Sequence, residues 1–224
     1  AGLVPPRSKV VADVGCDHAY VSIKLISDNT ADKVIAMDVR KGPLRIAENN
    51  IIKYGVEKNI DIRLSDGLER LSPDEADVII IAGMGGLLMK GILERGKTVI
   101  SGDKPPVLVL QPQSDIKEVR IFLYGNSYHI VREEMVFEDG KYYTAMLAYP
   151  GKEKTYDNEE DLIYGRYNIE TKSDILISYL KKESDIYKGI LDSLQDNYKE
   201  GTVERRLEIE TLLKINAAAQ ARCI

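Results

Sequence analysis

The sequence predicts an α/β fold in which a mostly parallel sheet of about seven strands precedes a helical extension. Apolar runs of strand length alternate with helix-spaced apolar patterns between residues 10 and 125. Two further strand-like runs then flank an Asp-Gly turn, and beyond Gly151 the chain becomes charged and helical. We therefore expect one domain at residues 1–151 and a second, helical domain at residues 152–224.

The elements of the first domain follow from the period of the apolar residues. Apolar runs predict strands at 10–14, 34–37, 60–64, 78–81 and 107–110. Helical spacing predicts helices at 20–26, 44–54, 87–94 and 115–125, with Gly55 as a C-cap. Residues 128–137 and 142–149 surround the Asp-Gly turn and predict a closing antiparallel hairpin. The loops that follow the parallel strands should therefore meet at one edge of the sheet.

The second domain carries a stripe of apolar residues at steps of three, four and seven. The stripe runs from Leu176 to Tyr198, is interrupted at Gly201, and resumes from Val203 to Ile215. This spacing predicts two antiparallel helices that pack like a coiled-coil hairpin. The alternative is that the helices simply cover the sheet.

Composition narrows the class of protein. The chain has 224 residues, a net charge of −5, two cysteines and two histidines. The cysteines form no Cys-x-x-Cys motif, so we expect neither a disulfide framework nor a metal site, and a cytoplasmic location. No apolar run reaches the roughly 18 residues that a membrane span needs. The acidic balance argues against a protein that wraps nucleic acid, but it leaves room for a local basic face.

The turn after the first strand is the strongest functional signal. Gly15 lies in a tight turn between a buried strand and a helix, and Asp38 ends the next strand. An acidic residue about twenty positions after such a turn can accept hydrogen bonds from both hydroxyls of a ribose. The pair therefore predicts a nucleoside-containing cofactor.

The turn favours S-adenosylmethionine over a dinucleotide. The dinucleotide fingerprint has three glycines so that a pyrophosphate can approach the backbone, whereas this turn has only Gly15. Asp17 stands where the pyrophosphate would lie and would repel it. A sulfonium or an ammonium would instead be attracted, and S-adenosylmethionine carries both and no phosphate. Cys16 is expected to pack rather than to act as a nucleophile, because no base accompanies it.

Three motifs resemble a known family. They are Asp-Val-Gly-Cys-Asp-His-Ala-Tyr at residues 13–20, Ile-Ala-Gly-Met-Gly-Gly at 81–86 and Leu-Gln-Pro-Gln at 110–113. The chain resembles, over nearly its full length, the bacterial tRNA (adenine-N1)-methyltransferases that modify adenosine 22, the TrmK-like proteins. This resemblance implies a Rossmann-like class I methyltransferase fold, an S-adenosyl-L-methionine cofactor and a tRNA substrate.

The resemblance also suggests individual roles. Asp17 and His18 would contact the methionine end of the cofactor, Asp38 the ribose and Val39 the adenine. Asp66 would accept a hydrogen bond from the exocyclic amine of the adenine, and Ala82 and Gly83 would lie under the sulfonium. The full set of expected cofactor residues is Asp13, Gly15, Asp17, His18, Asp38, Val39, Asp66, Gly67, Leu68, Ala82 and Gly83.

The expected substrate half lacks the usual signature of adenine amino-methylating enzymes. Many of these place Asn/Asp-Pro-Pro-aromatic after the fourth strand, whereas this chain has Gly-Met-Gly-Gly at residues 83–86. We therefore expect the catalytic residues Met84, Gly85, Gln111 and Pro112 to hold the base, with Tyr20 as a stacking candidate. Methyl transfer to N1 needs no prior proton removal, because N1 has a free lone pair. The nucleotide must be unpaired or swung out, since N1 lies on the pairing edge.

Other functions remain open at this stage. A class I methyltransferase acting on a small molecule or on another RNA would share the cofactor half. A dehydrogenase fits the single glycine less well, and a non-catalytic interaction protein could use the helical hairpin alone. The helices could hold tRNA phosphates through Lys181, Lys182, Lys188, Arg205 and Arg206, or these cations could form a solvated face.

Overall fold

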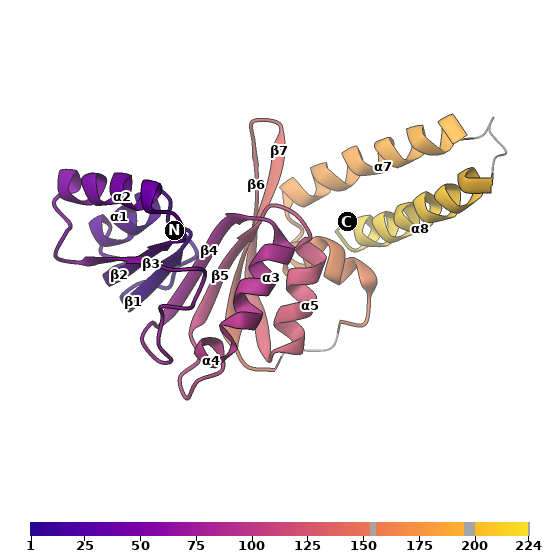
Figure 1. Cartoon of the computed structure of the whole chain (residues 1–224). Coiled ribbons are helices and arrows are strands. Elements are labelled where there is room, and N and C mark those ends of the chain that lie inside the picture. Colours follow the sequence, from indigo (N-terminus) through magenta and orange to yellow (C-terminus); the bar gives the residue numbers. More distant parts are fainter. Residues whose placement is uncertain (153–155, 195–199, 224) are drawn as a thin grey trace. The chain divides into compact units, whose positions relative to one another are not determined.

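The structure is a computed structural model that describes residues 1–152, 156–194 and 200–223 (Figure 1). Its sheet has seven strands in the order β3-β2-β1-β4-β5-β7-β6. The strands β1 to β5 are mutually parallel, and β7 pairs with β5 in the antiparallel sense. The predicted α/β fold with a mostly parallel sheet and a closing hairpin is confirmed.

The strands fall close to the predicted ranges. They are β1 (Ser8–Val14), β2 (Ala31–Asp38), β3 (Ile60–Leu64), β4 (Val78–Met84), β5 (Val107–Pro112), β6 (Tyr128–Glu138) and β7 (Lys141–Pro150). The helices are α1 (Tyr20–Ser27), α2 (Lys41–Tyr54), α3 (Gly86–Arg95), α4 (Lys97–Ile100), α5 (Ile116–Gly125), the π-helical turn η1 (Asp161–Gly165), α6 (Arg166–Glu170), α7 (Asp174–Leu194) and α8 (Glu200–Cys223).

Strand alternation builds a separate core on each face of the sheet. Val11, Val34 and Ile80 point to the face that α1 and α2 cover. Ala12 and Ile79, their neighbours in sequence, point to the opposite face, which α3, α4 and α5 cover. Because successive side chains of a strand face opposite sides, a strand covered on both faces must be apolar throughout. This explains the continuous apolar run in β4.

The chain divides into two compact units. The first comprises residues 1–132 and 144–153, and the second comprises 133–143 and 154–224. The second unit thus contains the tip of the β6–β7 hairpin together with the C-terminal helices. Its core is formed by buried residues of η1, α6, α7 and α8, namely Tyr164, Ile169, Leu176, Leu180, Ala219 and Cys223.

A polar cluster joins the helices of the second unit. The Glu183 carboxylate accepts hydrogen bonds from the hydroxyls of Tyr164 (2.6 Å) and Tyr179 (2.8 Å) and from the Asn216 amide (2.9 Å). Burial raises the pKa of both tyrosine hydroxyls, which keeps them protonated as donors. The cluster ties α7 to α8 and to η1.

The predicted interruption of the helical stripe falls near the boundary between the two long helices. α7 ends at Leu194, and Gly201 is the second residue of α8, in its first turn. The short elements α4, η1 and α6 were not predicted, because few residues carry their pattern. Tyr198, the expected end of the first stripe, lies outside the described residues.

Candidate active site

A cavity of about 460 Å³ opens at the carboxyl ends of the parallel strands β1, β2, β3 and β4. Such an edge is the usual ligand site of an open α/β sheet. Its volume lies within the range of small-molecule sites. It is lined by Val14, Gly15, Asp17, Asp38, Val39, Arg40, Ser65, Asp66, Gly67, Ala82, Gly83, Met84, Leu88 and Ile92.

The loop after β1 is held tightly against the end of β2. The backbone N–H groups of Gly15 and Cys16 both donate to the Met37 carbonyl, at 2.8 and 2.9 Å. Gly15 has a φ of +74°, and a Cβ atom there would collide with the Met84 methyl group. Glycine therefore suits both the left-handed turn and the close approach of Met84, which would have to move for a larger residue. The result is a flat backbone surface at the cavity wall.

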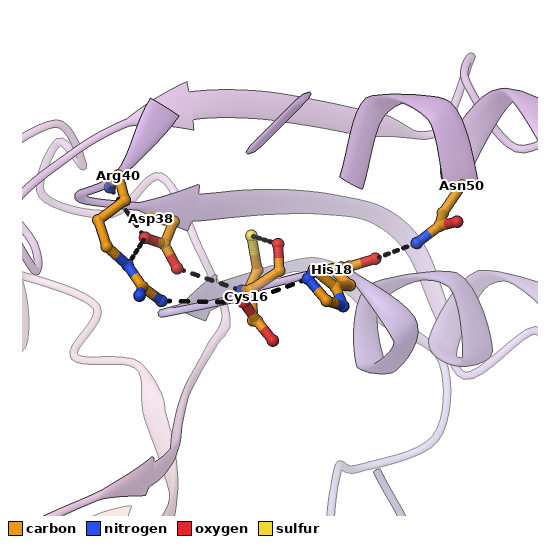
Figure 2. Close-up of polar contacts among 6 residues, drawn as sticks. Cys16, His18, Asp38, Arg40 and Asn50 are labelled. Carbon is orange, nitrogen blue, oxygen red and sulfur yellow. Dashed lines mark hydrogen bonds and ion pairs between the residues drawn. The ribbon is translucent and has the colours of Figure 1, made fainter. Parts of the chain in front are cut away.

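Asp38 is the most strongly fixed carboxylate of the cavity (Figure 2). It is 5 % exposed, and its oxygens accept the backbone N–H groups of Arg40 at 2.9 Å and Asp17 at 3.3 Å. A carboxylate oxygen has more than one lone pair, so acceptor capacity remains for ligand hydroxyls. Backbone donors thus orient an acceptor before any ligand arrives.

Arg40 bridges the acidic wall. Its guanidinium lies 3.6 Å from an Asp38 oxygen and 3.8 Å from an Asp17 oxygen (Figure 2). Asp17 also lies 3.7 Å from His18 Nε2. The His18 carbonyl in turn accepts the Asn50 side-chain amide at 3.0 Å. The wall therefore carries two carboxylates, and the long, exposed Arg40 side chain partly balances their negative charge. A cationic group of a ligand can displace this side chain.

The loop after β3 contributes Asp66 and Gly67. Ser65 is buried and its hydroxyl donates to the Gly67 carbonyl at 2.9 Å while it accepts the Arg70 N–H at 3.2 Å. Asp66 is exposed and pairs with Arg95 at 3.3 Å. Ser65 thus shapes the loop and Asp66 presents its carboxylate at the cavity.

The ends of β4 and β5 form the remaining wall. The pairing of the two strands shifts register between Ala82 and Met84, where Gly83 has a φ of +76°. The Gln111 side-chain oxygen accepts the Gly83 N–H at 2.9 Å. Gln111 therefore satisfies a backbone donor that the register shift removes from the strand ladder.

The structure brings most of the expected site residues into the one cavity and leaves others outside its lining. Those in the lining are Gly15, Asp17, Asp38, Val39, Asp66, Gly67, Ala82, Gly83 and Met84. Those outside the lining are Asp13, His18, Leu68, Gly85, Gln111 and Pro112. Sequence reasoning missed Val14, Arg40, Ser65, Leu88 and Ile92. Arg40 and Ser65 adjoin predicted residues, but nothing in the sequence pattern distinguishes them.

Two residues outside the lining have clear structural partners. Asp13 is buried and its carboxylate accepts the Ser22 hydroxyl at 2.6 Å, which links β1 to α1. Burial raises the pKa of Asp13, and the bond from Ser22 opposes that shift. Leu68 is 3 % exposed and packs in the core beneath α3.

Cys16 has the environment of a packing residue. It is buried in the core between the sheet and α1. Burial, reinforced by the negative charges of Asp13 and Asp38, raises the pKa of its thiol to about 12. A neutral thiol is a poor nucleophile, so the site has no cysteine chemistry near neutral pH.

The cations named as phosphate contacts are largely engaged within the second unit. Arg205 pairs with Glu208 at 2.6 Å, and Arg206 pairs with Glu210 at 3.0 Å on the same helix. The Lys182 ammonium lies 5.5 Å from the centre of the Tyr142 ring, at cation–π distance. The prediction that these side chains bind tRNA stays a prediction.

Comparison with known proteins identifies the family. The family model described as tRNA (adenine(22)-N(1))-methyltransferase matches residues 11–217. The chain is also 32% identical over 215 residues to the tRNA (adenine(22)-N(1))-methyltransferase of Bacillus subtilis, covering 91% of this chain and 90% of that protein. The chain belongs to the tRNA (adenine(22)-N(1))-methyltransferase family. The family resemblance drawn from residues 13–20, 81–86 and 110–113 is confirmed.

Solved structures of similar proteins include cofactor complexes. A Streptococcus pneumoniae protein in complex with S-adenosyl-L-methionine has a TM-score of 0.85 and 27% identity, with 98% of this chain and 95% of that chain covered. TrmK of M. capricolum in complex with S-adenosyl-homocysteine has a TM-score of 0.85 and 26% identity, with 99% and 95% covered. Among the described residues, no helix is long and apolar enough to cross a membrane.

Proposed function

We propose that this protein transfers the methyl group of S-adenosyl-L-methionine to N1 of adenosine 22 in tRNA. The observation that carries the proposal is the acidic cavity at the sheet edge, in a chain of this family. Asp17, Asp38 and Asp66 present carboxylates from three successive loops around the Gly15 turn. Hydroxyl, ammonium and amine donors of an adenosyl-methionine fit these acceptors, whereas a pyrophosphate would meet their repulsion.

Seven residues of the cavity would contact the cofactor. Asp38 accepts hydrogen bonds from the ribose hydroxyls, and the backbone N–H groups of Asp17 and Arg40 keep its carboxylate oriented. Asp66 accepts the adenine amine, with Val39 against the ring, and Asp17 attracts the methionine ammonium. Gly15, Ala82 and Gly83 allow backbone approach near the sulfonium. The cofactor supplies an electrophilic methyl group. The protein positions the reacting groups and supplies the electrostatic environment.

The base would be held by the opposite wall. Met84 and Gly85 lie at the end of β4, and Gln111 and Pro112 lie at the end of β5. No carboxylate stands among them, which suits a base that already has its N1 lone pair exposed. N1 would form its bond to the methyl carbon in line with the S–CH3 bond that breaks, S-adenosyl-homocysteine would leave as a neutral thioether, and no general base is required. Because methylation makes adenine cationic, nearby carbonyl oxygens favour the product charge.

A primer-extension assay tests the function directly. The protein is incubated with S-adenosyl-L-methionine and an unmodified tRNA transcript, and reverse-transcription stops are mapped. We expect a cofactor-dependent stop at adenosine 22 that disappears when guanosine replaces this nucleotide. Methyl transfer to another position, or to no RNA at all, would contradict the proposal.

A further inference from the structure

We propose that Arg95 is a positioning residue that fixes the Asp66 carboxylate for the adenine amine of the cofactor. This inference rests on the proposed function, since it needs the adenine in the cavity. Arg95 is the last residue of α3, and its Nη2 donates to Asp66 Oδ1 at 3.3 Å. A carboxylate held through one oxygen keeps its other oxygen available as an acceptor.

The guanidinium approaches Asp66 from behind the cofactor cavity. A second cavity of about 240 Å³ adjoins the first, and Asp66 and Ile92 line both. Arg95 lines only the second cavity. Asp66 therefore lies between the two cavities. Arg95 is on the side of the second cavity, and the proposed adenine site is on the side of the first. Arg95 does not occupy the space that the cofactor needs.

The Asp66 loop and the last turn of α3 are packed closely together, which brings the backbones of Arg95 and Asp66 near each other. A Cβ atom on Gly67 would lie 2.8 Å from the Ile92 side chain. One on Gly96, the C-cap of α3, would overlap the Leu68 side chain. Two glycines thus permit contact between the Asp66 loop and the last turn of α3. The helix C-terminus also favours a cation at Arg95.

Orientation matters because Asp66 is exposed. Its side chain is 57% exposed, so without a partner it would rotate freely and lose that freedom when the adenine amine binds. Prior fixation by Arg95 removes part of this cost. The effect should appear in cofactor affinity and should depend on the amine, which a general loss of stability would not.

The test is a double-mutant-type cycle in which Arg95 is removed from the protein and the 6-amino group is removed from the ligand. Calorimetry measures the binding of S-adenosyl-homocysteine and of its analogue with hydrogen in place of the 6-amino group, to the whole chain. Arg95→Met should weaken binding of S-adenosyl-homocysteine by about three- to tenfold. It should change binding of the analogue by less than about twofold. Lys97→Met, two residues further on, is the matched control and should alter neither ligand.

Several outcomes would overturn the assignment. Equal weakening of both ligands would make Arg95 a general structural residue, and unchanged or tighter binding of S-adenosyl-homocysteine would make it irrelevant or a competitor. If Arg95→Met fails to fold, Arg95→Gln replaces it. In an Asp66→Ala background, where Arg95 has no side-chain oxygen to bond, loss of Arg95 should have no further effect, and a further loss would contradict the proposal. Wild-type protein that ignores S-adenosyl-homocysteine would refute the proposed function itself, whereas failure of the Arg95 inference leaves wild-type binding intact.

Discussion

The two units use their polar side chains in opposite ways. In the first, Asp38 is oriented by backbone N–H groups and lines a cavity, so it keeps acceptor capacity at the cavity wall. In the second, the Glu183 carboxylate accepts hydrogen bonds from Tyr164, Tyr179 and Asn216. Buried polar groups that satisfy one another stabilise a fold, whereas groups fixed by backbone and left with acceptor capacity prepare a site. The contrast separates binding residues from structural ones.

The comparison predicts its largest effect at Asp38. Asp38→Asn replaces a charged acceptor by an amide whose NH₂ group meets the N–H groups of Asp17 or Arg40. We expect the dissociation constant for S-adenosyl-homocysteine, measured by calorimetry, to rise at least about a hundredfold, since two charge-assisted hydrogen bonds are together worth about 3–6 kcal/mol. Asp28→Asn, at an exposed ion pair beyond α1, is the control. If Asp38→Asn binds S-adenosyl-homocysteine within twofold of wild type, the contrast between Asp38 as a binding residue and Glu183 as a structural one is wrong.

Gly15 should give the next largest effect. Gly15→Ala forces a side chain into a left-handed φ and pushes the Met84 methyl group toward the cavity. We expect a loss of about 1–3 kcal/mol in unfolding free energy and about tenfold weaker cofactor binding. Chemical denaturation and calorimetry measure the two. Gly42→Ala, where the added atom meets open space, should lower neither.

Gln111 sharpens the comparison within the first unit. Gln111→Ala leaves the Gly83 N–H without its acceptor at the end of β4. We expect kcat for tRNA methylation to fall about tenfold while cofactor affinity changes little, because one lost hydrogen bond is worth about 1 kcal/mol. Gln111→Glu retains an oxygen and should recover part of the rate. Gln113→Ala, a neighbour whose side chain is exposed, serves as control. Full turnover of Gln111→Ala would remove Gln111 from the catalytic set.

Glu183 tests the other side of the comparison. Glu183→Ala strands the Tyr164, Tyr179 and Asn216 donors, at an expected cost of about 1–3 kcal/mol. Amide hydrogen exchange should accelerate in α7 and α8, and cofactor affinity should not change. Asp185→Ala, an exposed neighbour on the same helix, should leave exchange unaltered. Weakened cofactor binding in Glu183→Ala alone would show that the two sets of polar groups are coupled.

The sequence predicts the positions of the strands better than the residues that line the cavity. Strand positions follow from apolar runs, and the joint presence of Gly15 and Asp38 follows from a fixed spacing between a turn and the next strand end. Ser65 and Ile92 reach the cavity only because the β3 loop packs against α3, a tertiary contact without a periodic signal. Which residues of the expected site act on cofactor and substrate remains a prediction.

The smallest expected effect is at Cys16, which lies beside the acidic wall yet belongs to the core. Because burial raises the pKa of its thiol to about 12, only about one molecule in ten thousand carries the thiolate at pH 8. Iodoacetamide at pH 8 should therefore label Cys16 of the folded protein far more slowly than Cys16 of the chain unfolded in guanidinium, as peptide mass spectrometry can measure. Cys16→Ala should methylate tRNA at nearly the wild-type rate. Rapid labelling, or loss of turnover with the fold intact, would place a nucleophile in the site and contradict the assignment of catalysis to position and charge.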